Sequence, residues 1–153
     1  MEATGNPQQS PDWTRQLVLV NQVDEISKLA GFIDEVAELA ALDVSLVMSL
    51  NLALEEAVTN VVLYAYPEGQ SGKVDIQASM KGRLLTFVIS DAGVPFDPTT
   101  EAVEADITLS VEDRPIGGLG VFLVKQIMDT VSYQRTGGRN VLTLVKNVGE
   151  PAV

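Results

Sequence analysis

Two hairpin patterns constrain the fold of this chain more than any other feature of its sequence. Two apolar runs, Lys73 to Met80 and Leu84 to Ser90, are joined by Lys81-Gly82-Arg83, an arrangement that is typical of a β-hairpin. Residues 131–146 repeat the pattern around two consecutive glycines, which predicts a second hairpin. Because a hairpin pairs neighbouring strands in opposite directions, we expect a mostly antiparallel sheet.

Three other segments are predicted to be helical. After a short strand at Gln16 to Val20, Asn21 is expected to cap a helix whose apolar residues recur with helical spacing. Asp43 is expected to cap a second helix that runs to about Ala65. The third helix is predicted at Gly117 to Asp129.

These elements predict an α/β (α+β) two-layer sandwich, with a mixed, mostly antiparallel sheet that carries helices on one face. The 153 residues, 46% of them hydrophobic, suffice for one domain with a substantial core. We expect residues 1–12 to form a disordered leader, 13–147 a single domain and 148–153 a tail. The stretch from Val94 to Ile116 breaks the periodicity, and such a long irregular segment is often a functional lid.

Charge and hydropathy argue against two classes of partner. The 10 basic and 21 acidic side chains leave a net charge of −11, which repels the phosphate backbone of nucleic acids. No apolar run approaches the roughly 18 residues of a transmembrane helix, and the polar N-terminus lacks the apolar stretch of a signal peptide. We therefore expect a cytoplasmic protein with no direct nucleic-acid partner and no membrane partner.

Two residue types are missing from the sequence. The absence of cysteine excludes disulfides, thiolate nucleophiles and cysteine metal sites. The absence of histidine excludes imidazole base catalysis, a Ser-His-Asp triad and histidine metal ligands. Any proton transfer near neutral pH must therefore fall to a carboxylate, a lysine or a tyrosine.

Three short segments together predict an ATP site. Glu56-Ala-Val-Thr-Asn60 lies on the second helix, Asp91-Ala-Gly93 follows an apolar strand, and Gly117-Gly-Leu-Gly120 opens the third helix. A carboxylate and an amide one helical turn apart can address a nucleophile and a magnesium ion. An aspartate at a strand end can read a base edge, and glycines before a helix can hold phosphate.

Each segment also has an ordinary structural explanation when it is taken alone. Glu56 and Asn60 border the apolar face of their helix, so they can be a rim glutamate and asparagine. Asp91 can belong to a strand-terminating turn, and clustered glycines can form a plain turn. The P-loop and dinucleotide-binding motifs do not occur in the chain. The ATP hypothesis therefore depends on the combination of the three segments.

In order and spacing, the three segments resemble the motifs of the GHKL (Bergerat-fold) ATPase superfamily. Leu54 to Asn60 is similar to the family's N box, Ile89 to Gly93 to its first glycine box, and Gly117 to Phe122 to its second. Within the superfamily, the chain resembles the serine-protein-kinase anti-sigma factors that regulate bacterial stress and sporulation sigma factors. The resemblance extends from about Gln16 to Lys146.

The resemblance implies a role for each residue of the first two motifs. Glu56 would be the catalytic base that takes the proton from a serine hydroxyl. Asn60 would bind Mg through its amide oxygen. Asp91 would hold the adenine of ATP, and Gly93 would let the backbone pass the base.

The second glycine box is implied to bind phosphate. Gly117, Gly118, Leu119 and Gly120 would bring backbone amides to the phosphates at the start of the third helix. Arg114 stands where the family often has a basic residue. It would contact phosphate or close the lid; otherwise it is a solvated loop arginine.

The chain departs from the family pattern in two places. Members often carry histidine just after the N box, where this chain reads Val62-Leu-Tyr-Ala-Tyr66, and Tyr64 is expected to fill that space. The last strand of the family often offers a threonine near the adenine, whereas this chain reads Arg139-Asn-Val-Leu-Thr143. Asn140 and Thr143 are therefore left out of the predicted site.

By resemblance, the chain is expected to be an ATP- and Mg-dependent serine/threonine-protein kinase that acts as an anti-sigma factor. Its substrate would be a serine or threonine of a STAS-type anti-anti-sigma protein, and its competing partner a sigma factor. A homodimer is implied by analogy alone. Two alternatives stay open: a nucleotide-gated protein-binding regulator without kinase turnover, and a scaffold that has lost ATP.

Overall fold

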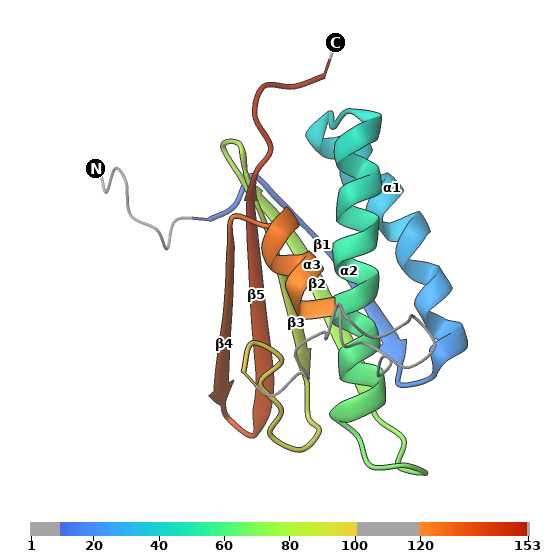
Figure 1. Cartoon of the computed structure of the whole chain (residues 1–153). Helices are drawn as coiled ribbons and strands as arrows, with labels where there is room; N and C mark the ends of the chain where they lie inside the picture. Colours follow the sequence, from blue (N-terminus) through green and yellow to red (C-terminus); the bar gives the residue numbers. More distant parts are fainter. Residues whose placement is uncertain (1–9, 101–119, 153) are drawn as a thin grey trace, which may run out of the picture.

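A computed structural model describes residues 10–100 and 120–152, and these form an antiparallel five-stranded sheet with helices on one face (Figure 1). The sheet order is β1-β2-β3-β5-β4, and every neighbouring pair of these strands is antiparallel. The strands are β1 (Trp13–Val20), β2 (Lys73–Lys81), β3 (Leu84–Asp91), β4 (Thr130–Thr136) and β5 (Arg139–Asn147). Both predicted hairpins are confirmed.

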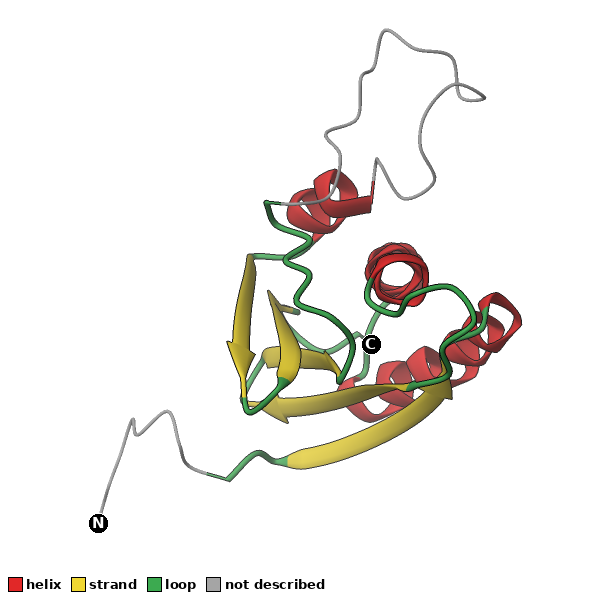
Figure 2. Ribbon diagram, turned by 90° about the horizontal axis from the view of Figure 1, so that it is seen from below, coloured by secondary structure: helices red, strands yellow, loops and turns green. Residues whose placement is uncertain are grey.

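Three α-helices and a short 3-10 helix cover one face of the sheet, and the opposite face carries no helix among the described residues (Figure 2). In chain order they are η1 (Val23–Ser27), α1 (Lys28–Ala40), α2 (Val44–Tyr64) and α3 (Gly120–Ile127). α2 lies between α1 and α3 and packs against both. This arrangement confirms the predicted two-layer sandwich.

The core lies between the sheet and the helices. Alternate residues of the strands point toward the helices and are fully buried, as Ile76 on β2, Phe87 on β3 and Leu144 on β5 show. They meet the apolar stripe of α2, which includes Leu50 and Leu54. The alternation along the strands and the helical spacing on α2 thus bring two apolar surfaces together.

α2 begins where the sequence predicts. The backbone N–H of Leu46 donates to Asp43 Oδ1 at 2.8 Å, so the aspartate side chain satisfies one of the free amides of the first turn. The helix ends at Tyr64, and the N–H of Ala65 still donates to the carbonyl of Val61. Both predicted ends of this helix are therefore confirmed to within about one residue.

α2 is an exception to the expectation that no apolar run in the sequence approaches the length of a transmembrane helix. Its 21 residues have a mean hydropathy of 1.4 over an 18-residue window, which by length and composition alone is apolar enough to cross a membrane. Core helices of globular domains share that composition, and α2 packs against the sheet, α1 and α3. Burial of one side of α2 in the core therefore accounts for part of its apolar composition.

The predicted capping role of Asn21 is wrong. The first helical segment is the 3-10 helix η1, whose N-cap residue is Gln22, and α1 starts only at Lys28. The Asn21 side chain instead donates to the carbonyl of Gln70 and accepts from the N–H of Gly72, both at 2.8 Å. Asn21 therefore ties the loop after β1 to the loop before β2.

Residues near both ends of the described chain form hydrogen bonds with the rest of the domain. The N–H of Asp12 donates to the Met80 carbonyl at 2.6 Å, and the Asp12 carboxylate accepts from the N–H of Gly82 at 3.0 Å. At the other end, the N–H of Ala152 donates to the carbonyl of Ala41 at 2.7 Å. β1 accordingly starts at Trp13, three residues before the predicted strand.

Candidate functional site

Glu56 and Asn60 lie one turn apart on α2, with different degrees of burial. The Asn60 side chain is almost fully buried, with 1% of its surface exposed, whereas Glu56 is half-buried. The Asn60 Oδ1 atom has no hydrogen-bond partner among the described residues. A buried amide oxygen without a partner is costly, so this atom is a good candidate for a ligand contact.

The surroundings of Glu56 disfavour the charged form of its carboxyl group. Burial raises the pKa of its carboxyl group above the usual value, and the neighbouring Glu55 raises it further by charge repulsion. A carboxylate with a raised pKa is a better proton acceptor than an ordinary surface glutamate. This direction of shift suits a general base.

Asp91 is the last residue of β3 and is also buried, with 1% of its surface exposed. Its Oδ1 atom accepts two hydrogen bonds, from the N–H of Gly93 at 2.8 Å and from Asn140 Nδ2 at 2.9 Å. No donor from the described parts of the chain bonds to Oδ2. The carboxylate is therefore held in one orientation and keeps one oxygen for a ligand that donates hydrogen bonds.

Asn140 is absent from the predicted site, yet it contacts Asp91 directly. Besides that bond, its Nδ2 atom donates to the Val94 carbonyl at 2.8 Å. Its Oδ1 atom accepts from the N–H of Phe96 at 3.1 Å, from Arg135 Nη1 at 3.2 Å and from the Tyr133 hydroxyl. One buried amide thus holds the loop after β3 against β4 and β5.

The reason that sequence reasoning missed Asn140 is visible in the strand pairing. Asn140 lies directly opposite Asp91 across the β3–β5 ladder, a pairing between segments far apart in the chain. One local signal could have identified it: Asn140 takes the inward-facing place in the alternation that continues with Leu142 and Leu144. A polar residue at such a position needs partners. Thr143, by contrast, falls on the other side of the sheet in the same alternation.

Gly93 has a structural reason to be glycine that differs from the one predicted. A Cβ atom at this position would collide with the backbone carbonyl of Ala65, at the end of α2. The next residue makes use of this close approach, because the N–H of Val94 donates to that same carbonyl at 2.7 Å. The loop after β3 is thereby joined to the end of α2 that carries Asn60. Whether Gly93 also passes an adenine ring stays a prediction.

Tyr64 occupies the position discussed for the missing family histidine. Its ring packs against Phe96, with 5.5 Å between the ring centroids. Phe96 belongs to the loop that Asn140 holds. The two rings therefore join the end of α2 to the loop after β3 by apolar contact, which fits the expectation that tyrosine fills this space.

The described part of α3 starts at Gly120 and packs beside α2 (Figure 1). Gly120 is the first residue of the helix as described, and backbone amides in the first turn of a helix favour anions. The other predicted phosphate-binding residues, Arg114, Gly117, Gly118 and Leu119, lie outside the described residues.

The donor set fits a magnesium ion that is bound together with phosphate. Within residues 10–100 and 120–152, no group of three or more acidic side chains gathers to hold a metal by itself. Magnesium usually takes one or two protein oxygens and completes its shell with water and phosphate oxygens. The unpartnered Asn60 Oδ1 atom is an oxygen of this kind.

Comparison with known proteins agrees with this geometry. Residues 19–146 match the family model described as the histidine kinase-like ATPase domain. The chain is 32% identical over 99 residues to the serine/threonine-protein kinase BtrW of Bordetella bronchiseptica, covering 65% of this chain and 69% of that protein. It is 30% identical over 121 residues to the serine-protein kinase RsbW of Listeria monocytogenes, covering 77% of this chain and 76% of that protein.

A solved structure shares the fold. The chain resembles the crystal structure of the RsbU and RsbW domains of a Mycobacterium tuberculosis protein, with a TM-score of 0.65 and 16% sequence identity. The match covers 94% of this chain and 35% of that larger chain. It supports the fold described above.

Proposed function

Because this chain belongs to the histidine kinase-like ATPase domain family, we propose that it is an ATP-dependent serine/threonine-protein kinase. Relatives that are named serine-protein kinases support this reading at the level of the family. The observation that carries the proposal is the pair on α2. The Asn60 Oδ1 atom is buried without a partner among the described residues, and Glu56, one turn away, has a raised carboxyl pKa.

The proposed roles follow from the chemistry of these groups. Asn60 would coordinate Mg, which when bound offsets the negative charge of the ATP phosphates. Glu56 would accept the proton of a serine or threonine hydroxyl on the substrate. The hydroxyl oxygen would then bond to the γ-phosphorus while the bond between that phosphorus and the β–γ bridging oxygen breaks, which releases ADP. Asp91 Oδ2 would accept a hydrogen bond from the amino group of adenine.

We also propose the partners that the family resemblance implies. The phosphoacceptor would be a serine or threonine of a STAS-type anti-anti-sigma protein, and a sigma factor would compete for the kinase. The kinase would thus act as an anti-sigma factor in the cytoplasm. The homodimer stays a prediction.

The test is transfer of phosphate from ATP to a purified STAS partner, measured for the wild type and for Glu56→Gln. The proposal expects transfer by the wild type and loss of transfer in the variant, with nucleotide binding retained because Asn60 and Asp91 are unchanged. Glu38→Gln, an exposed substitution on α1, is the matched control and should transfer normally.

The same experiment addresses a regulator without kinase turnover. Such a protein would bind its partner in the presence of nucleotide but would transfer no phosphate, and Glu56→Gln would bind that partner as the wild type does. Tight partner binding without transfer would overturn the kinase proposal in favour of this second function.

A further inference from the structure

The outer face of α2 exposes large apolar side chains at a regular spacing. Val44, Met48 and Leu52 follow one another at intervals of four residues and are 76%, 68% and 41% exposed. Residues spaced in this way lie along one side of a helix. A helix with apolar residues on its exposed side as well as its buried side usually has a further surface to cover it.

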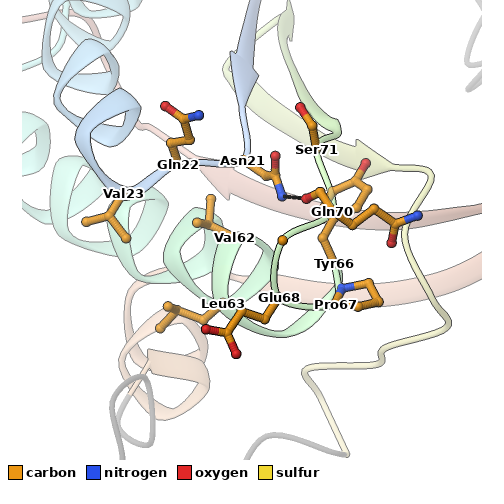
Figure 3. A pocket seen from close by; sticks show the side chains of 11 residues that line it. Asn21, Gln22, Val23, Val62, Leu63, Tyr66, Pro67, Glu68, Gln70 and Ser71 are labelled. Carbon is orange, nitrogen blue, oxygen red and sulfur yellow. Dashed lines mark hydrogen bonds between the residues drawn. The ribbon is translucent and has the colours of Figure 1, made fainter.

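A pocket lies at the other end of the same helix (Figure 3). It has a volume of about 560 Å³ and lies between the end of α2, η1 and the loop that leads to β2. Val62 and Leu63 of α2, Val23 of η1 and Pro67 give it apolar walls, and Glu68 places a carboxylate among its lining residues. Val23 itself is 63% exposed.

The exposed row and the pocket lie along one surface. Leu63 follows Leu52 by about three helical turns, so the two residues are on the same side of α2. From Val44 to Leu63 this side measures about 29 Å at 1.5 Å per residue. We call this surface, from Val44, Met48 and Leu52 to the pocket, the α2 outer face.

Acidic side chains outnumber basic ones around the α2 outer face, and the helices that pack beside α2 carry one base each, Lys28 on α1 and Lys125 on α3. Neither α2 nor the set of residues that lines the pocket contains a lysine or arginine. The single base of α1, Lys28, is paired with Glu25 at 2.8 Å. Exposed acidic residues are present on both helices, among them Asp34 and Glu38 on α1 and Glu55 on α2. The surface therefore combines apolar contact area with an excess of negative charge.

We propose that the α2 outer face binds a basic amphipathic helix of a partner protein. The apolar side of that helix would cover Met48 and Leu52, and one of its lysine or arginine side chains would enter the pocket with its stem on Leu63 and its charge near Glu68. A second copy of this chain is disfavoured on this particular face because each copy has a net charge of −11 and the face itself carries excess negative charge. An anionic membrane is disfavoured for the same reason.

The docking surface lies on a different side of α2 from Asn60, the proposed magnesium ligand, whereas Glu56, the proposed base, follows Leu52 by one turn and borders the surface. Asn60 lies on the buried side of α2 and Met48 on the exposed side. Magnesium–ATP binding is therefore expected to be unchanged by substitutions on the outer face. The test of the docking surface measures peptide binding and magnesium–ATP binding and no phosphate transfer, so its outcome does not depend on the proposed role of Glu56.

The test uses a synthetic helical peptide of about 18 residues, roughly 27 Å long, made of leucine at helical spacing and lysine elsewhere. Binding to the whole chain is measured by fluorescence anisotropy, beside a peptide of the same pattern with glutamate in place of lysine. The lysine peptide should bind and the glutamate peptide should not. The double variant Met48→Gln/Leu52→Gln should lose about tenfold or more in affinity for the lysine peptide.

The matched control is Val18→Gln/Leu84→Gln, two residues that are 46% and 48% exposed on the sheet face without helices. This variant should bind the lysine peptide as the wild type does, and both double variants should bind magnesium–ATP equally. Equal peptide affinity in all three proteins would reveal general attraction to an acidic surface and would overturn the proposal. Self-association of the wild type that Met48→Gln/Leu52→Gln abolishes would also overturn it, in favour of a second copy.

Discussion

At the scale of single residues, Asn60 and Asn140 show two uses of a buried amide. Asn140 makes five hydrogen bonds, so both ends of its side chain are satisfied and its orientation is fixed. Asn60 keeps its oxygen without a partner among the described residues. The first arrangement stabilises a loop, whereas the second leaves an oxygen ready for a ligand.

The Asn140 network predicts the effect of Asn140→Ala. Truncation would leave the N–H of Phe96 and Asp91 Oδ1 without this partner, at a cost of about 2–4 kcal/mol in the free energy of unfolding. ATP affinity should fall as well, because Asp91 would lose the bond that orients it. Urea unfolding and calorimetric titration measure the two effects. Thr143→Ala, on the outer face of the same strand, should change stability by less than about 1 kcal/mol, and an equal loss in both variants would refute the network's role.

The raised pKa of Glu56 predicts a pH-dependent change in stability for Glu56→Gln. Burial disfavours the charged carboxylate in the folded state, so the wild type is destabilised once the pH rises through the folded-state pKa. Below the unfolded-state pKa the group is protonated in both states, and this penalty disappears. The variant should therefore gain stability relative to the wild type at pH 7.5 compared with pH 4, as followed by urea unfolding. A difference that does not vary with pH would contradict the assigned burial of the charge.

At the scale of elements, short sequence patterns correctly predicted the features whose contacts join residues close together in the chain. The Asp43 cap and the glycine turn at Gly82 act within a few residues, and both elements form as predicted. Asn21 has the composition of a helix cap, yet its partners Gln70 and Gly72 lie about fifty residues away. A contact of that range outweighed the local preference, and no short pattern around Asn21 signals it.

Two glycine substitutions, one in the loop after β3 and one on α1, should change the stability of the fold in opposite directions. Gly93→Ala would drive a Cβ atom into the Ala65 carbonyl and should destabilise the fold by about 1–3 kcal/mol. Gly31 is exposed on α1, and a Cβ atom added there would meet nothing within 4 Å, so Gly31→Ala should stabilise by about 0.5–1 kcal/mol. Thermal unfolding of both variants measures this. Equal effects of the two substitutions would contradict the close approach at Gly93.

At the scale of the whole molecule, the fold class was predictable because alternation and helical spacing each specify one buried face. The candidate site was only partly predictable. Glu56, Asn60 and Asp91 belong to short motifs, whereas the pairing of Asp91 with Asn140 arises only when β5 joins β3 in the sheet. The site is thus assembled by long-range strand pairing around residues that the motifs identify.

Asn60 is proposed to supply an oxygen to a magnesium–nucleotide complex. Calorimetric titration with ATP, with and without magnesium, tests it on the wild type, on Asn60→Ala and on the control Asn51→Ala. Asn51 is also on α2, but its amide donates to the Val47 carbonyl at 3.2 Å. Magnesium should strengthen ATP binding in the wild type and in Asn51→Ala but not in Asn60→Ala. The same gain in all three proteins, or no ATP binding by the wild type, would contradict the claim.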